Sequence, residues 1–241
     1  MSSRRTLRLA TLLGPNTIDD LRHIAAHLDG RGVETTIVDA HDLPDIGDGV
    51  AGALVASGVD LLWACGLLTA ELVADGAALD VVAAPVFASE TAPVYRSVIV
   101  ARRGETTGRR LAVNEFGSWS GYRALFHDAT IRGTNRWHPD QMDEIVVTGA
   151  HVASAFAVVD GKADAAAIDH SVWNWLVNSD PGAVEDLVVV DQTVDCPAPP
   201  ISLGRGLQGR DRVGLIEALL GFEGPPLLVP ASIDDYRFML A

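Results

Sequence analysis

Two short stretches combine small hydroxyl residues with glycine, a chemistry that can hold an oxyanion without a positive side chain. They are Asn114–Tyr122, with the sequence NEFGSWSGY, and Thr148–Ser154, with the sequence TGAHVAS. Each lies between a β-like run and a helix-like run, so backbone N–H groups would be free at a helix N-terminus beside the hydroxyls. Two such turns on neighbouring strands of one sheet would face the same crevice. We therefore predict that Ser118, Ser120 and His151 converge on one small oxyanion.

The first turn superficially matches the serine-hydrolase elbow, G-x-S-x-G. In Gly117–Gly121 the central position is Trp119, so the nucleophile position holds no serine. Taken alone, the segment fits equally well an N-capped helix that follows a tight turn. Its pairing with the second hydroxyl-rich turn is what favours an anion site.

His151 has several chemical roles open to it: general base, metal ligand, or hydrogen-bond donor to an anion, beside the ordinary role of a capping or surface residue. No second His or Cys stands at metal-ligand spacing from it. His170 directly follows Asp169, so these two side chains would point in different directions. We expect no metal site and no cofactor.

Other candidate residues lie at the ends of predicted strands. Asp169 would face the crevice, where a carboxylate can select an amino group on the ligand or bridge two lobes, whereas Asp164 fits a turn or strand edge. Trp63 is as consistent with core packing as with a ligand wall. Tyr95 and Ser97 come just before a predicted crossover, where the phenol could reach a cleft.

The composition excludes some classes of function. A formal charge of −14 and a pI near 4.7 leave no basic face for nucleic acid. No apolar run approaches the length of a membrane span, and Arg8 interrupts the N-terminal apolar run, which is too short for a signal peptide. As written, the chain is expected in the cytoplasm, or in the periplasm or outside the cell if a leader has been removed. Cys65 and Cys196 form no CxxC pair, and a single bridge between them stays open.

Strand-like and helix-like runs alternate along the chain, which predicts an α/β fold with mainly parallel sheets. We expect residues 1–97 and 200–241 to form one lobe and residues 98–199 a second, joined by two extended crossovers near Tyr95–Arg102 and Val190–Pro200. The expected strands are 7–13, 34–38, 61–64, 81–87, 97–100, 111–113, 145–147, 163–168 and 187–190. The expected helices are 17–28 with Thr17 as N-cap, 48–56, 69–75, 122–129, 152–159, 171–178 and 211–220, followed by a 234–240 tail that packs on the first lobe.

Five segments in order resemble the phosphonate/phosphite/phosphate-type substrate-binding proteins of ABC transporters, a branch of the type II periplasmic-binding-protein fold. They are Gly58–Gly66 (GVDLLWACG), Tyr95–Ser97 (YRS), Asn114–Tyr122, Thr148–Ser154, and Gly161–Asp169 (GKADAAAID). The resemblance implies a two-lobed fold with an interlobe cleft and a permease of the transporter as partner. It also implies that Ser118, Ser120 and His151, with N–H groups near Trp119 and Gly121, hold the anionic head. Tyr95 and Trp63 would wall the organic part, Ser97 would belong to the hinge side of the site, and Asp169 would contact the rest of the ligand.

The sequence departs from that family pattern at three positions. Glu115 replaces an aspartate, Ala150 replaces a common serine, and Trp119 is larger than the small residue often found between the two serines. One hydroxyl is therefore missing from the expected cradle, and the pocket is expected to be smaller or differently shaped.

Two functions of different classes fit these observations. The first is a solute-binding protein that closes on a small oxyanion, such as a phosphonate or a phosphate ester, without chemistry. The second is a cytosolic enzyme on the same fold, a dehydratase-like or biosynthetic enzyme, in which His151 or Asp169 would be the general acid or base.

Overall fold

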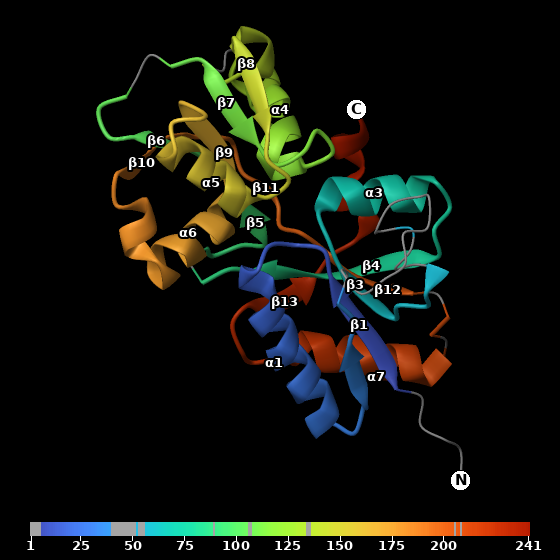
Figure 1. The fold of residues 1–241 in the computed structure, drawn as a ribbon. Coiled ribbons are helices and arrows are strands. Elements are labelled where there is room, and N and C mark those ends of the chain that lie inside the picture. The colour runs from blue at the N-terminus through green and yellow to red at the C-terminus, as the bar shows by residue number, and fades with distance from the viewer. Residues whose placement is uncertain are drawn as a thin grey trace. The chain divides into compact units, whose positions relative to one another are not determined.

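The structure is a computed structural model that describes residues 6–39, 52, 56–88, 90–105, 108–133, 136–204, 206–207 and 209–241. The chain forms two compact α/β units, one made of residues 1–94 and 197–241 and the other of residues 95–196. Each limit lies three residues before the one expected from the sequence. Figure 1 shows the two units, with the first in blue, teal and red and the second in green to orange.

The first unit is built on a six-stranded mixed sheet with the strand order β13-β4-β12-β3-β1-β2. β1 pairs in parallel with β2 and β3, whereas β12 and β13 run antiparallel to their neighbours. Its strands are β1 (Leu7–Thr11), β2 (Thr35–Ile37), β3 (Leu61–Trp63), β4 (Leu79–Val86), β12 (Ile201–Gly204) and β13 (Leu227–Pro230). Its helices are α1 (Asn16–Gly30), α3 (Gly66–Ala74) and α7 (Gly209–Leu220), with short 3₁₀ turns η5 (Ile233–Asp235) and η6 (Arg237–Leu240).

The second unit is built on a five-stranded sheet with the strand order β10-β6-β9-β7-β8. β7, β8 and β9 are parallel, and β6 is antiparallel to both β9 and β10. Its strands are β6 (Ser97–Arg102), β7 (Arg110–Val113), β8 (Glu144–Val147), β9 (Ala165–Asp169) and β10 (Leu187–Gln192). Its helices are the π-helical turn η2 (Trp119–Arg123), α4 (Ala124–Arg132), η3 (Pro139–Gln141), α5 (His151–Val159), α6 (His170–Ser179) and η4 (Pro181–Val184).

Successive side chains of β6 and β9 point to opposite faces of the sheet, so they contribute to two separate cores of the second unit. Val98, Val100 and Ile168 pack with residues of α5 and α6, whereas Ile99 packs on the other side with Leu125 of α4. In Figure 1 these helices lie beside the sheet. The run of alanines in β9 is fully buried, which lets the strand lie close beneath its neighbours. A central, rigid β9 therefore places Asp169 at a fixed point of the sheet edge.

An ion pair holds the opposite end of β7 and β9 together. The Arg110 guanidinium lies 2.6 Å from the Asp164 carboxylate, whose other oxygen accepts the Arg110 backbone N–H at 2.8 Å. These bonds hold the pKa of Asp164 below its usual range. Asp164 therefore has the structural, strand-edge role that the sequence favours.

The two connections between the units are extended. Short strands β5 (Val94–Tyr95) and β11 (Cys196–Pro197) pair as a two-stranded sheet. The expected crossover segments thus contain paired strands at the points where the chain passes from one unit to the other. Cys65 and Cys196 form no disulfide in the structure.

Several details differ from the expectations drawn from the sequence. Strands β12 and β13 were not expected, because the prolines that flank them read as loop. Thr17 is not the N-cap of α1: the helix begins at Asn16, and the Thr17 hydroxyl donates to the Gly14 carbonyl. The helix expected at 48–56 lies almost entirely outside the described residues. Among the helices that the structure describes, none combines the length and the apolar character that a membrane span needs.

Candidate functional site

The predicted site residues of the second unit lie on or beside strands that meet at one edge of its sheet, whereas Trp63 belongs to the first unit. The parallel strands β7, β8 and β9 all end there, at Val113, Val147 and Asp169. Antiparallel β6 begins at the same edge, because Ser97 is paired with Asp169. Ligands of α/β sheets bind beyond the carboxyl ends of parallel strands, so the fold places this set of residues where a ligand is expected.

The first hydroxyl-rich turn leads from β7 into η2 and α4. The Ser118 hydroxyl oxygen caps η2 by accepting the Gly121 N–H at 3.1 Å, which leaves its own hydrogen for another acceptor. Asn114 packs its side chain against Gly121 so closely that a methyl group there would overlap the Asn114 Oδ1. The turn therefore needs glycine at 121 for space. A π-helical turn at the start of a helix is often found at functional sites.

The second turn lies directly beside the first. The Thr148 N–H donates to the Val113 carbonyl at 2.9 Å, and the Gly149 N–H donates to the Asn114 carbonyl at 2.8 Å. The Thr148 and Ser154 hydroxyls lie 2.7 Å apart and bond each other, so they brace the turn from within. Ala150 at the cap position offers no side-chain acceptor to the first N–H groups of α5. The serine-to-alanine departure therefore leaves this helix N-terminus without the side-chain cap that usually satisfies it.

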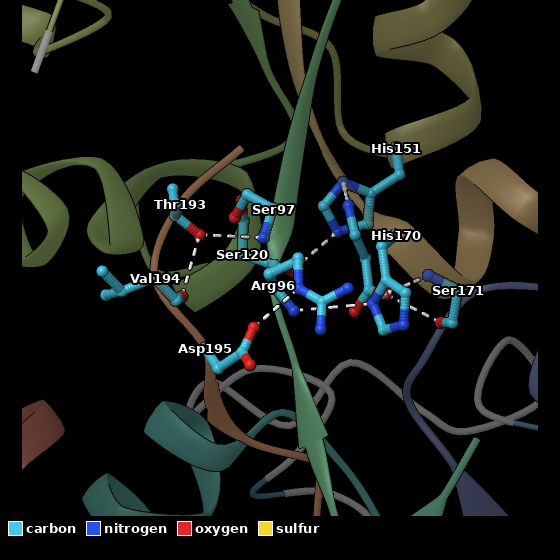
Figure 2. Close-up of polar contacts among 10 residues, drawn as sticks. Arg96, Ser97, Ser120, His151, His170, Ser171, Thr193, Val194 and Asp195 are labelled. Atoms are coloured by element: carbon cyan, nitrogen blue, oxygen red, sulfur yellow. Dashed lines mark hydrogen bonds and ion pairs between the residues drawn. The ribbon is translucent and has the colours of Figure 1, made fainter. Parts of the chain in front are cut away.

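Ser120 and His151 meet where the two turns adjoin. The Ser120 Oγ lies 3.2 Å from the His151 Nε2, and the His151 Nδ1 lies 3.4 Å from the Asp169 backbone nitrogen. Figure 2 shows this contact beside Arg96 and Ser97. Burial lowers the pKa of His151, while the charge of Asp169 and a hydrogen bond to the Ala167 carbonyl act in the opposite direction. The neutral ring is therefore favoured when the site is empty, and either tautomer has a partner.

Asp169 has a role that the sequence did not reveal. Its Oδ1 accepts the Ser171 N–H at 2.8 Å and the Ser171 hydroxyl at 2.7 Å, so the carboxylate caps α6. Contact between Asp169 and a ligand stays a prediction, and only the second carboxylate oxygen is outside this cap.

Ser97 is fully buried and contacts the first turn from below. Its hydroxyl donates to the Ser120 carbonyl at 2.5 Å. Its backbone N–H donates to the Thr193 Oγ1 at 3.0 Å, and its carbonyl accepts the Thr193 N–H at 2.9 Å. Figure 2 shows Ser97 with its hydrogen bond to Thr193. These bonds give the buried Ser97 a supporting role at the first turn, and its contact with a ligand stays a prediction.

The aromatic candidates are all buried. The Trp119 ring packs against His127 with centroids 5.4 Å apart. Burial raises the pKa of the Cys196 thiol to about 11. Trp63 is fully buried in the first unit and donates its indole N–H to the Pro199 carbonyl at 3.0 Å. Tyr95 is buried at the start of the second unit. These contacts give Trp63 and Trp119 packing roles, and ligand contact by the three aromatic residues stays a prediction.

The ion pair between Arg96 and Asp195 was not predicted from the sequence. The Arg96 Nε lies 2.6 Å from the Asp195 Oδ1, joining the two segments that enter and leave the second unit (Figure 2). Ninety-nine positions separate the two residues, so no spacing in the sequence could reveal the pair.

A cavity of about 250 Å³ in the second unit lies away from this edge. Its lining residues come before β7 and β8, so it is at the opposite end of those strands. Residues 108, 109, 136, 137, 141 and 142 line it. Among the described residues, no three His, Cys, Asp or Glu side chains are grouped so that they could hold a metal ion.

Comparison with known proteins gives a family and several structural neighbours. The family model described as "ABC transporter, phosphonate, periplasmic substrate-binding protein" matches residues 32–237. A search among curated proteins found no match.

Among solved structures, PhnD1 of Prochlorococcus marinus in complex with methylphosphonate has a TM-score of 0.74 at 15% identity, covering 99% of this chain and 97% of that one. A binding protein of an ABC phosphonate transporter from Pseudomonas aeruginosa has a TM-score of 0.71 at 14% identity, covering 97% and 84%. A Xanthomonas citri protein bound to ATP has a TM-score of 0.63 at 16% identity, covering 99% and 95%. At these identities the neighbours show the two-lobed α/β fold.

Proposed function

This chain belongs to the family of periplasmic phosphonate substrate-binding proteins of ABC transporters, and from that premise we propose that it binds one small tetrahedral oxyanion, a phosphonate or a phosphate ester, reversibly and without converting it. The observation that carries the proposal is the contact of 3.2 Å between Ser120 and His151 at the start of α5. It joins the two hydroxyl-rich turns into one set of donors.

The hydrogen-bond donors of the site are suited to reversible binding of an anion. The Ser118 and Ser120 hydroxyls, the His151 ring and the first N–H groups of α5 are all neutral when the site is empty. Such dipoles bind an oxyanion through charge-assisted hydrogen bonds, and a helix N-terminus adds a favourable partial charge. In a chain with a formal charge of −14, these local dipoles have to offset a repulsive overall field.

The geometry of the donors favours a tetrahedral anion. Hydroxyls and N–H groups come from two adjacent turns, so they can surround three oxygens of one head group. A planar carboxylate offers two oxygens in one plane and would satisfy fewer of these donors. Two of the structural neighbours were solved with methylphosphonate and with ATP, which carry tetrahedral phosphorus groups.

The family also suggests a place of action and a partner. We propose that the ligand-bound protein delivers its anion to the permease of an ABC transporter, in the periplasm or on the outer side of the membrane. Neither compartment nor partner follows from the site residues themselves, and both rest on family membership.

Isothermal titration calorimetry tests the proposal. Methylphosphonate, inorganic phosphate, a phosphate monoester and acetate are titrated into wild type and Ser120→Ala. We expect a tetrahedral anion to bind, acetate to bind more weakly or not at all, and Ser120→Ala to weaken binding by about 1.5–3 kcal/mol, the value of a hydrogen bond to a charged group.

Ser202→Ala is the control, because Ser202 is fully buried in β12 of the first unit, outside the predicted cradle. If no tetrahedral anion binds while a carboxylate substrate is turned over, the protein is the alternative enzyme and the proposal is wrong.

A further inference from the structure

We propose that Ser97 is a positioning residue: a buried hydroxyl that fixes the Ser120 peptide and thereby orients the Ser120–His151 pair for an anion. The inference rests on the proposed function, because it concerns the same cradle. It goes further by assigning the geometry of that cradle to a residue that does not touch the ligand.

The first step is the bond itself. The Ser97 hydroxyl donates to the Ser120 carbonyl at 2.5 Å, and neither Ser97 nor Ser120 is more than slightly exposed. A carbonyl in the first turn of a helix usually accepts an N–H four residues later. The Ser120 carbonyl lies in the π-helical turn η2 and accepts a buried hydroxyl from another element, which fixes the plane of the peptide that follows the Ser120 side chain.

The second step is what holds Ser97 in place. Antiparallel pairing sets Ser97 opposite Asp169 in the sheet. On its other side the Ser97 N–H donates to the Thr193 hydroxyl, and the Ser97 carbonyl accepts the Thr193 N–H. Neighbouring Arg96 is held in turn by Asp195 and by the backbone of His170. The Ser97 hydroxyl is therefore held in a fixed position, and its hydrogen bond restricts the orientation of the Ser120 carbonyl.

The third step links Ser120 to His151. A shift of the Ser120 peptide would move the Ser120 Oγ, which lies 3.2 Å from the His151 Nε2. His151 is surrounded by few titratable groups among the described residues; the Asp169 carboxylate is the one whose charge acts on it. A looser turn would hydrate the ring, and because burial lowers the pKa of His151, hydration would move that pKa back toward its ordinary value.

The experiment uses Ser97→Ala, with Ser202→Ala as a matched deletion of a fully buried serine hydroxyl in the other unit. The His151 titration is followed by NMR of the ring nitrogens in the absence of ligand, and affinity for methylphosphonate is measured by calorimetry. We expect Ser97→Ala to raise the His151 pKa and to weaken methylphosphonate binding by about tenfold, the upper range for one neutral hydrogen bond. Ser202→Ala should change neither.

Further variants separate positioning from stability. Ser97→Thr keeps the hydroxyl and should restore most of the affinity. Ser97→Cys fills the space with a weak donor, serves if Ser97→Ala does not fold, and should behave as Ser97→Ala does. An unchanged His151 titration in a folded Ser97→Ala or Ser97→Cys protein overturns the inference, whatever the thermal stability. If wild type binds no methylphosphonate, the proposed function is in question, but the comparison of His151 titrations still decides the role of Ser97.

Discussion

At the scale of single residues, the predicted anion site depends on neutral hydrogen-bond donors that also contact one another. His151 contacts Ser120 with one ring nitrogen and the backbone of β9 with the other. The neutral ring has one hydrogen-bond donor and one acceptor, whereas the protonated ring has two donors. The pH dependence of anion binding distinguishes the two forms.

We predict that anion binding is coupled to protonation of His151. Burial lowers the pKa of the empty-site ring below its ordinary value near 6.5, whereas a bound anion would raise it. Affinity should therefore fall as pH rises above the empty-site pKa, by at most about tenfold per pH unit for one proton. Calorimetry of methylphosphonate on wild type and His151→Gln tests this, because ionisation of the ligand contributes equally to both profiles.

Parallel pH profiles for the two proteins would mean that the neutral ring binds the anion.

Without ligand, the pH dependence of stability has the opposite direction to that of anion affinity. Since the folded-state pKa is lowered, the contribution of His151 to stability is present above the unfolded value and is lost as pH falls through the folded value. Wild type should lose more stability than His151→Gln over that interval.

At the scale of elements, the two turns are shaped by packing as well as by hydrogen bonds. Asn114 fills the space beside Gly121, Ser118 caps η2, and Thr148 braces α5 through Ser154. The family-like pattern of small residues therefore has a steric basis, since the turns must approach one another closely.

We predict that Gly121→Ala destabilises the protein by about 1–3 kcal/mol, the usual range for overpacking a buried site. The new methyl group would overlap the Asn114 side chain and press on the Ser118 hydroxyl. Gly117→Ala is the matched control, because a methyl group at Gly117 meets nothing within 4 Å. Thermal unfolding and methylphosphonate titration of both variants provide the measurement.

The second variant to add is Asn114→Ala combined with Gly121→Ala, which removes the overlap. It should recover part of the lost stability if steric overlap is the cause. Equal stabilities for Gly117→Ala and Gly121→Ala would show that the turn can relax, and the steric account of Gly121 would then be wrong.

At the scale of the whole molecule, two units are joined by two extended connections, and the family to which the chain belongs consists of solute-binding proteins. We predict that saturating methylphosphonate makes the protein more compact. Small-angle X-ray scattering should show a smaller radius of gyration with ligand than without. The thermal stability should also rise, by about 2.7 kcal/mol at 100 times the Kd.

Ser120→Ala at the same methylphosphonate concentration is the control for this measurement, since its weaker binding should leave a smaller change. A radius of gyration that stays constant while calorimetry shows saturation would exclude closure of the units on the ligand. Binding would then involve the second unit alone.

The sequence by itself determined the order of strands and helices and the location of both hydroxyl-rich turns. Apolar runs of period two, glycines and caps are local signals, so most of the expected strands are present within a few residues of their expected bounds. The motifs in order also identified the family, which the family model confirms. Where prolines obscured the local signal, as around Ile201–Gly204 and Leu227–Pro230, the strands were missed.

Only the tertiary structure decided what each polar side chain does at the sheet edge. Antiparallel register sets Ser97 opposite Asp169 and beneath Ser120, so Ser97 supports the turn where ligand contact was expected. The Asp169 carboxylate is partly used by Ser171, and the Trp119 ring packs against His127. Partners such as Ser97 and Thr193 are far apart along the chain, and strand register brings them together. Local sequence patterns carry no record of that register, which is why the candidate residues could be located from the sequence but their roles could not.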